Sequence, residues 1–202
     1  MNGPFLGDLS LLVFLPLVGA VVLLLLPRGK TGVLFGTALL FLLFNFLWSL
    51  RIFWRFDAAN GEMQFTERLP WIPAYGIDYF IGIDGLSLFL VLLTTFLGPI
   101  VILASWNINK RVKEYLFFMM ILQTSMIGTL VALDLFLFYV FWEIMLLPMY
   151  FIIGIWGGPR RIYAAVKFVI YTMSGSLLML VAIIYLVTAA GQVTQSTTFD
   201  LL

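Results

Sequence analysis

The stretch Leu135–Gly158 reads LFLFYVFWEIMLLPMYFIIGIWGG and decides the fold class of the whole chain. It is longer than the about 20 apolar residues that a helix needs to cross a hydrocarbon core of roughly 30 Å. One carboxylate, Glu143, stands near its middle. Eight residues at about 1.5 Å each place Glu143 roughly 12 Å from Leu135, close to the midplane. An ionisable group at that depth is costly and usually marks an ion or proton path.

A proline follows the acid within the same span. Pro148 has no backbone N–H, so the carbonyl of Ile144 loses its helical donor and a kink is favoured. A buried acid beside a loosened helical turn is the arrangement that a proton relay requires. The alternative is that Glu143 is a structural carboxyl group, protonated and hydrogen-bonded to a neighbouring helix. We favour the functional interpretation, because midplane acids are rare without a role in transport.

Composition excludes several classes of protein. With 63% hydrophobic and 10% charged residues among 202, the chain is not a soluble globular domain. A formal net charge of +1 provides no basic field for nucleic acid. The chain has no Cys and no His, so it cannot ligate an iron–sulfur cluster through cysteine or a haem through histidine, and it lacks a typical zinc site. We therefore expect no cofactor in this chain, with any electron transfer on other chains.

The hydrophobic pattern predicts an all-α polytopic membrane protein with a single membrane domain over 1–202. We expect six transmembrane helices, at about 9–26, 33–53, 86–106, 115–133, 135–156 and 162–188. The one extended loop, Phe56–Asp84, contains prolines and Gly76 among aromatic and β-branched residues, which suggests turns and a short hairpin on the membrane surface. Asp134 is expected to cap the fifth helix. Small residues four apart on the fourth helix, among them Gly128, suit close helix packing.

Basic residues are unequally shared between the two sides of the predicted bundle. Three of the turns carry seven of them: Arg28, Lys30, Lys110, Arg111, Lys113, Arg160 and Arg161. The opposite side carries three: Arg51, Arg55 and Arg68. By the positive-inside rule the first side is cytoplasmic. We therefore expect a multi-pass protein of the bacterial cytoplasmic (inner) membrane, with its N-terminus outside and its extended loop extracytoplasmic.

Polar residues recur on the fifth and sixth helices. Tyr139, Glu143 and Tyr150 share one face of the fifth, and the sixth carries a polar face of its own: Tyr163, Lys167, Tyr171 and Ser174. Measured from the connecting turn, Glu143 lies roughly 20 Å deep and Lys167 roughly 10 Å. A direct ion pair would exceed the reach of one lysine, so water and the tyrosines would have to bridge the two. Lys167 could instead snorkel to the nearer membrane interface.

Three strings carry a resemblance to one family. They are GIDGLSLFLVLLTTFLGPIVILASW (Gly82–Trp106), FYVFWEIMLLPMYFIIGIWG (Phe138–Gly157) and RRIYAAVKFVIYTMSGSLLML (Arg160–Leu180). They resemble the antiporter-like membrane subunits of respiratory complex I, specifically the subunit 4 type, which is the M subunit of bacterial NADH:quinone oxidoreductase. Members of that family have fourteen helices, so this sequence corresponds to the first six. The resemblance implies that the antiporter-like core begins near residue 115, and autonomous transport by these six helices is not expected.

The resemblance also implies a function. The glutamate matching Glu143 belongs to the proton-translocation machinery of the family, and a lysine resembling Lys167 occurs in several related subunits. The implied role is a proton-translocating subunit of NADH:quinone oxidoreductase, a membrane enzyme whose redox centres lie on other subunits. Its expected partners are other membrane subunits, especially neighbouring antiporter-like ones, and the lipid bilayer. The alternatives are a subunit of a multisubunit sodium/proton antiporter or membrane-bound hydrogenase, and a passive membrane scaffold.

Overall fold

The computed structural model describes residues 7–194 and 198–201. Six helices long and apolar enough to cross a membrane lie in this part of the chain, which confirms the predicted fold class of a polytopic helical membrane protein. They are α1 (Asp8–Leu25), α2 (Thr31–Arg55), α3 (Gly85–Ala104), α4 (Val112–Val131), α5 (Leu135–Trp156) and α6 (Arg161–Thr194).

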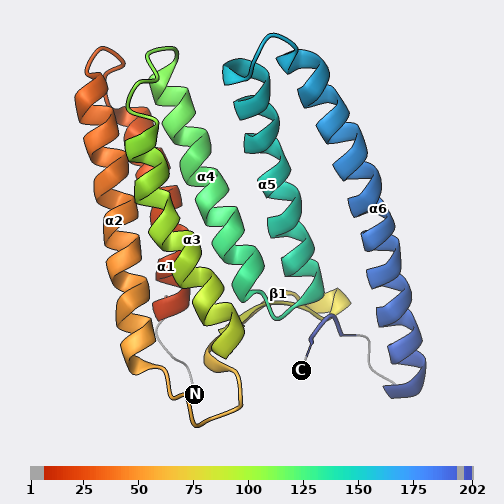
Figure 1. Cartoon of the computed structure of the whole chain (residues 1–202). Coiled ribbons are helices and arrows are strands. Elements are labelled where there is room, and N and C mark those ends of the chain that lie inside the picture. The colour runs from red at the N-terminus through yellow and green to blue at the C-terminus, as the bar shows by residue number, and fades with distance from the viewer. Residues whose placement is uncertain (1–6, 195–197, 202) are drawn as a thin grey trace.

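The helices run side by side, and the turns α1–α2, α3–α4 and α5–α6 all lie at one end of the bundle (Figure 1). Helix α4 is central, packing against α1 on one side and α5 on the other, while α2 packs against α3. Helix α6 lies at the edge and packs chiefly on α5. The seven basic residues of the three turns are thus gathered at the same end of the bundle.

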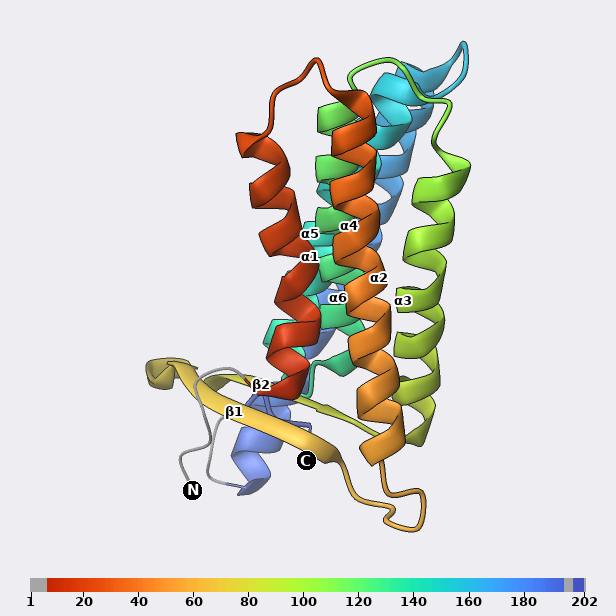
Figure 2. The same ribbon diagram turned by 90° about the vertical axis from the view of Figure 1, so that its left-hand side faces the viewer.

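The extended loop folds as a hairpin across the opposite end of the bundle (Figure 2). Strands β1 (Gln64–Ile72) and β2 (Ile77–Ile83) pair antiparallel, as the sequence predicts. Gly76 closes the connecting turn with φ 64°, a left-handed conformation that glycine adopts without steric cost. The hairpin is tied to the bundle, because the Leu133 amide donates to the Phe80 carbonyl at 2.8 Å.

Local signals explain where the helices begin. Asp84 caps α3 by accepting from the Ser87 amide at 2.7 Å, and the Ser87 hydroxyl completes the capping box. The Asp134 side chain accepts from the Leu137 amide at 2.9 Å, so the predicted cap of α5 is confirmed. Helix α4 starts three residues earlier than predicted, after Arg111 turns the chain at φ 51°. Helix α6 runs six residues further, through helix-forming alanines.

The predicted small-residue face of α4 lies in the core. A side chain added at Gly128 would meet Phe141 of α5 at 2.4 Å, so the glycine permits the close approach of the two helices. Gln123 packs against Gly98 of α3 and donates from Nε2 to the Thr94 carbonyl at 2.9 Å. Helix α4 therefore holds α5, the helix of the candidate acid, against the rest of the bundle.

Candidate functional site

Glu143 lies half-buried in the middle of α5. Its Oε1 atom is buried and has no hydrogen-bond partner among the residues that the structure describes. The helix continues through Pro148 to Trp156, so the proline removes one backbone hydrogen bond without ending the helix. The acid and the weakened turn thus lie in one continuous segment, as the sequence predicts.

A tyrosine one turn earlier connects Glu143 to α6. The Tyr139 hydroxyl lies near the side chains of Glu143 and Ser176 and interacts with both. Ser176 is 3% exposed, and its hydroxyl also donates to the Met173 carbonyl at 3.1 Å. Ser176, Tyr139 and Glu143 therefore lie together at the interface between α5 and α6, where Oε1 of Glu143 has no hydrogen-bond partner among the described residues.

The serine of α6 that meets α5 is Ser176 and not Ser174, which belongs to the polar face that the sequence analysis described. Ser174 is exposed, whereas Ser176 faces α5. Two residues along a helix turn the side chain by about 200°, so the two serines lie on nearly opposite faces. Ser176 lies on the buried face of α6 with Ala165, Ile183 and Val187, at intervals of eleven, seven and four residues, and no signal in the sequence distinguishes this face from that of Ser174.

Lys167 lies elsewhere on α6. It belongs to the exposed face together with Tyr163, Tyr171 and Ser174, and its Nζ lies 5.8 Å from the centroid of the Tyr163 ring. No ion pair joins it to Glu143 within residues 7–194 and 198–201. The structure therefore places Lys167 on the exposed face of α6 without a direct ion pair to Glu143, and the bridge through water and the tyrosines stays a prediction.

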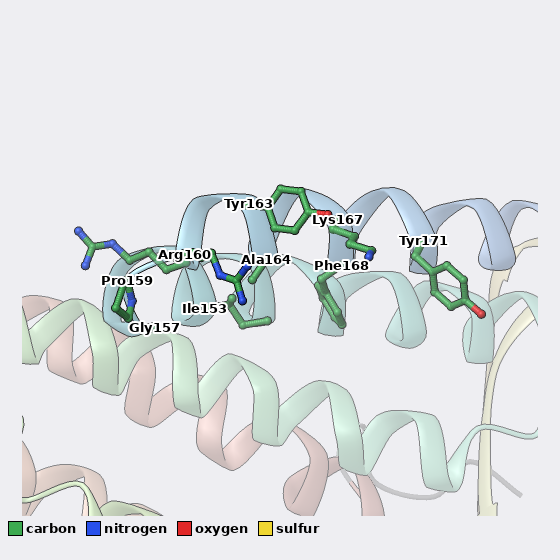
Figure 3. A pocket seen from close by; sticks show the side chains of 11 residues that line it. Ile153, Gly157, Pro159, Arg160, Tyr163, Ala164, Lys167, Phe168 and Tyr171 are labelled. Carbon is green, nitrogen blue, oxygen red and sulfur yellow. The ribbon is translucent and has the colours of Figure 1, made fainter.

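A groove of about 720 Å³ lies beside Lys167, at the turn between α5 and α6 (Figure 3). Most of its lining comes from α6 and the turn, and Ile153 comes from α5. Figure 3 shows Tyr163 and Lys167 next to each other on α6, with Tyr171 further along the helix. Lys167 thus lies at an aromatic and cationic surface rather than inside the bundle.

At the other end of α5, a polar network joins the hairpin to the helix start. Burial raises the pKa of Asp134, which also accepts from the Asp78 amide at 3.2 Å. Arg68 bonds Asp78 at 2.7 Å and Asp200 at 2.8 Å, and the bond to Asp78 raises the pKa of its guanidinium. These contacts between the hairpin, the start of α5 and the residues near 200 could not be read from the sequence.

A second contact that the sequence does not signal fixes the hairpin to α1. The Glu67 carboxylate accepts from the Leu9 amide at 2.8 Å and from the amide and hydroxyl of Ser10, so it caps α1 from a distant strand. The Ser10 hydroxyl lies 2.9 Å from that of Tyr79, and burial raises the pKa of Tyr79 to about 12. The hairpin is therefore held at both sides of the bundle.

This geometry suits proton chemistry at Glu143. A carboxyl group in a low-dielectric interior interacts strongly with any charge that approaches it, because water does not screen the interaction. Its free oxygen can accept a hydrogen bond from a water molecule, and Tyr139 can both donate and accept. The Glu143 carboxyl group has what a proton acceptor needs. It is partly buried, it lies beside the Tyr139 hydroxyl, and its Oε1 atom is free to accept a hydrogen bond.

Comparison with known protein families covers nearly the whole chain. Residues 11–129 match the family described as NADH-ubiquinone oxidoreductase chain 4, amino terminus. Residues 132–202 match the family described as NADH:quinone oxidoreductase/Mrp antiporter, transmembrane. The boundary between the two matches falls at the junction of α4 and α5.

Two curated relatives match most of the chain. NADH-quinone oxidoreductase subunit M of Rhodobacter capsulatus is 48% identical over 187 residues, which are 91% of this chain and 36% of the relative. NADH-ubiquinone oxidoreductase chain 4 of Marchantia polymorpha is 42% identical over 190 residues, 93% of this chain and 38% of the relative. The chain therefore spans less than two fifths of the length of these relatives.

Solved structures agree with the fold. A chain of respiratory complex I from Thermus thermophilus with bound NADH superposes with a TM-score of 0.75 at 31% identity, over 95% of this chain and 38% of that one. A chain of the Mrp complex from Dietzia sp. shares the fold, with a TM-score of 0.77 at 22% identity over 91% of this chain and 20% of that one. Together with the match over 11–129, these similarities show that the chain belongs to the NADH-ubiquinone oxidoreductase chain 4 family, whose bacterial relatives are named subunit M.

Proposed function

We propose that this chain provides the Glu143-bearing part of a proton-translocating membrane subunit of NADH:quinone oxidoreductase. The observation that carries the proposal is the position of Glu143, an acid in the middle of a membrane span whose buried Oε1 has no partner among the described residues. Ionisable groups inside membrane spans are rare and mark ion or proton pathways. The relatives at 48% and 42% identity carry names of this oxidoreductase.

The driving force in this proposal is electrostatic. A charge of opposite sign brought within about 4–6 Å of a carboxylate changes its proton affinity by roughly 1–3 pKa units, which is about 1.4–4 kcal/mol. Moving one elementary charge through 100 mV costs about 2.3 kcal/mol. The two energies are of the same size, so a change in the distance between Glu143 and a cation can load or release a proton against a membrane potential. Lys167 is one candidate for that cation, although it lies on the outer face of α6.

Other subunits carry the electrons in this proposal. The chain has neither Cys nor His, the residues that most often hold iron–sulfur clusters and haem. Oxidation of NADH and reduction of quinone are therefore assigned to partner subunits. The chain itself would bind no cofactor and would assemble with neighbouring antiporter-like membrane subunits.

We also propose the orientation. The end of the bundle with the three basic turns faces the cytoplasm of a bacterial inner membrane, and the hairpin end faces outward. Reporter fusions after Lys30, Lys113 and Arg161 are expected to give a cytoplasmic signal, and fusions between residues 56 and 63 an external one. The reverse pattern would overturn the orientation.

The proposal is tested by replacing Glu143 in the assembled membrane complex. Glu143→Gln keeps the shape and the ability to form hydrogen bonds, but it cannot bind and release a proton near neutral pH. We expect normal assembly with most proton translocation lost, and partial activity for Glu143→Asp. Membrane vesicles energised with NADH report translocation through quenching of a pH-sensitive dye, measured beside the rate of NADH oxidation.

Glu114→Gln is the matched control. Glu114 undergoes the same chemical change but lies in the first turn of α4, at the membrane edge, where it contacts Arg28 at 3.5 Å. We expect nearly normal translocation for this variant. Near-normal quenching by Glu143→Gln at matched assembly would refute the proton role and favour a passive scaffold.

A further inference from the structure

A polar layer crosses helices α1 to α4 in the middle of the bundle. The buried apolar side chains of these helices form two separate clusters, one that includes β2 and lies toward the hairpin, and one toward the turns. In each of these four described helices, every buried residue between the two clusters is polar, glycine or proline. We call the buried residues within 14–19, 43–51, 92–101 and 121–126 the mid-bundle polar layer.

Two side chains of this layer are buried without partners. Oδ1 and Nδ2 of Asn45 and Oγ1 of Thr124 form no hydrogen bond with the residues that the structure describes. The other polar side chains of the layer each form at least one. Asn45 is 0% and Thr124 6% exposed in this chain alone, so their burial depends on no further helix or subunit. Buried polar atoms of this kind are normally paired, with protein or with internal water.

The packing of α1 places Asn45 and Thr124 at one level of the bundle. A Cβ added at Gly19 of α1 would lie 2.8 Å from Phe41 of α2 and 2.8 Å from Met120 of α4, so the three helices meet there. Helices α2 and α4 run in the same direction, because the turns α1–α2 and α3–α4 lie at the same end (Figure 1). Asn45 follows Phe41 by four residues, and Thr124 follows Met120 by four. Each therefore lies one turn nearer the hairpin, on the same side of its helix.

Helix α1 supplies a backbone acceptor close to this level. Pro16 is buried and lies three residues before Gly19, and it has no N–H to donate to the Leu12 carbonyl. Because α1 runs opposite to α2 and α4, this turn of α1 also lies nearer the hairpin than Gly19 does. The three helices thus offer one amide donor, two carbonyl acceptors and one hydroxyl group that can donate or accept.

We propose that Asn45 and Thr124 bind an internal water molecule in the mid-bundle polar layer, with the Leu12 carbonyl as a further acceptor. Buried water typically forms two to four hydrogen bonds and both donates and accepts, which matches this set of groups. A monovalent cation would bind the oxygens but leave Nδ2 of Asn45 unpaired, and the layer has no carboxylate to balance its charge. This inference is independent of the proton role of Glu143.

A cryo-electron microscopy map of the assembled membrane complex, at a resolution that shows ordered water, tests the proposal. We expect a density peak about 2.6–3.2 Å from the Asn45 amide and from Oγ1 of Thr124. Asn45→Leu and Thr124→Val each remove a partner and are expected to lose the peak. Thr129→Val is the matched control in the same helix, because the Thr129 hydroxyl already donates to the Ser125 carbonyl at 2.9 Å. It is expected to keep the peak.

Radiolytic hydroxyl-radical labelling, read by mass spectrometry, gives a second measurement on the same complex. Met120 is 0% exposed and lies one turn from Thr124, so radicals from bulk water do not reach it, whereas radicals formed from a bound water do. We expect oxidation of Met120 in wild type and in Thr129→Val, and its loss in Asn45→Leu. Thr124→Val serves for both measurements if Asn45→Leu does not assemble.

Three results would overturn the proposal. A map in which the Asn45 amide bonds Thr124 directly, with no peak between them, would replace the water by a direct contact. A peak closer than about 2.5 Å to the oxygens and away from Nδ2, which disappears when sodium is removed, would assign the site to a cation. Equal oxidation of Met120 in wild type and in Asn45→Leu, at matched assembly, would show that the radicals do not come from this site.

Discussion

Replacement of Gly128 by alanine tests the contact that fixes α5 in place. An added Cβ would lie 2.4, 2.5 and 2.6 Å from three ring atoms of Phe141, which is far inside van der Waals contact. Phe141 is only 6% exposed, so its ring has little free space into which to move. Overpacking of this kind costs about 1–3 kcal/mol, while alanine regains about 0.5–1 kcal/mol of helix propensity. We expect a net loss of about 1–2 kcal/mol of stability, or roughly 2–8 °C in Tm.

Thermal unfolding in detergent micelles, followed by tryptophan fluorescence, measures this loss. Gly36→Ala in α2 is the control, because an added Cβ there meets nothing within 4 Å. It is expected to be neutral or slightly stabilising, by up to about 1 kcal/mol. The double variant Gly128→Ala, Phe141→Leu replaces the ring by a smaller side chain and should recover part of the loss. Stability of Gly128→Ala equal to wild type, or no recovery in the double variant, would refute the packing argument.

Three further predictions concern single side chains. Lys167→Ala should reduce proton translocation less than Glu143→Ala, because Lys167 lies on the exposed face of α6; equal losses in dye quenching would contradict this. Tyr139→Phe removes the hydroxyl that interacts with Glu143 and should shift the infrared bands of the Glu143 carboxyl group. These bands are identified by subtracting the spectrum of Glu143→Gln, and unchanged bands in Tyr139→Phe would exclude the contact. Hydrogen bonds from Ser87 lower the pKa of Asp84, so its carboxylate stabilises α3 at neutral pH, and this contribution disappears as the pH falls below about 4 and through the folded pKa. Asp84→Ala should therefore cost about 0.5–2 kcal/mol at pH 7 and less near pH 3, as measured by thermal unfolding; an equal cost at both pH values would contradict the linkage.

The parts of the fold that depend on local pattern could be predicted from the sequence. Apolar runs of span length define all six helices, and prolines with Gly76 define the hairpin. The cap at Asp134 and the close approach at Gly128 also follow from residue type and position. In each case the signal lies within a few residues of the feature, so no knowledge of the tertiary structure is needed.

The partners of the candidate site depend on how each helix is rotated about its axis. The sequence identifies Glu143 and Tyr139 on one face of α5, but it does not say which face of α6 meets them. Ser174 and Ser176 are equally plausible by composition, and the structure selects Ser176. The Glu67 cap of α1 could not be predicted for a related reason, because it joins residues 58 positions apart.

Glu143 lies on a helix that is held closely on one side. On its α4 side, α5 is fixed by stacking of Phe118 on Phe151 at 4.7 Å and by the close approach of Phe141 to Gly128. On another side, Tyr139 meets Ser176 of α6. Coulomb energy falls as the distance between two charges grows, so the proposed relay requires a charge to approach or leave Glu143. Because the α4 side is closely packed, we expect that charge to approach from a face of α5 that does not contact α4.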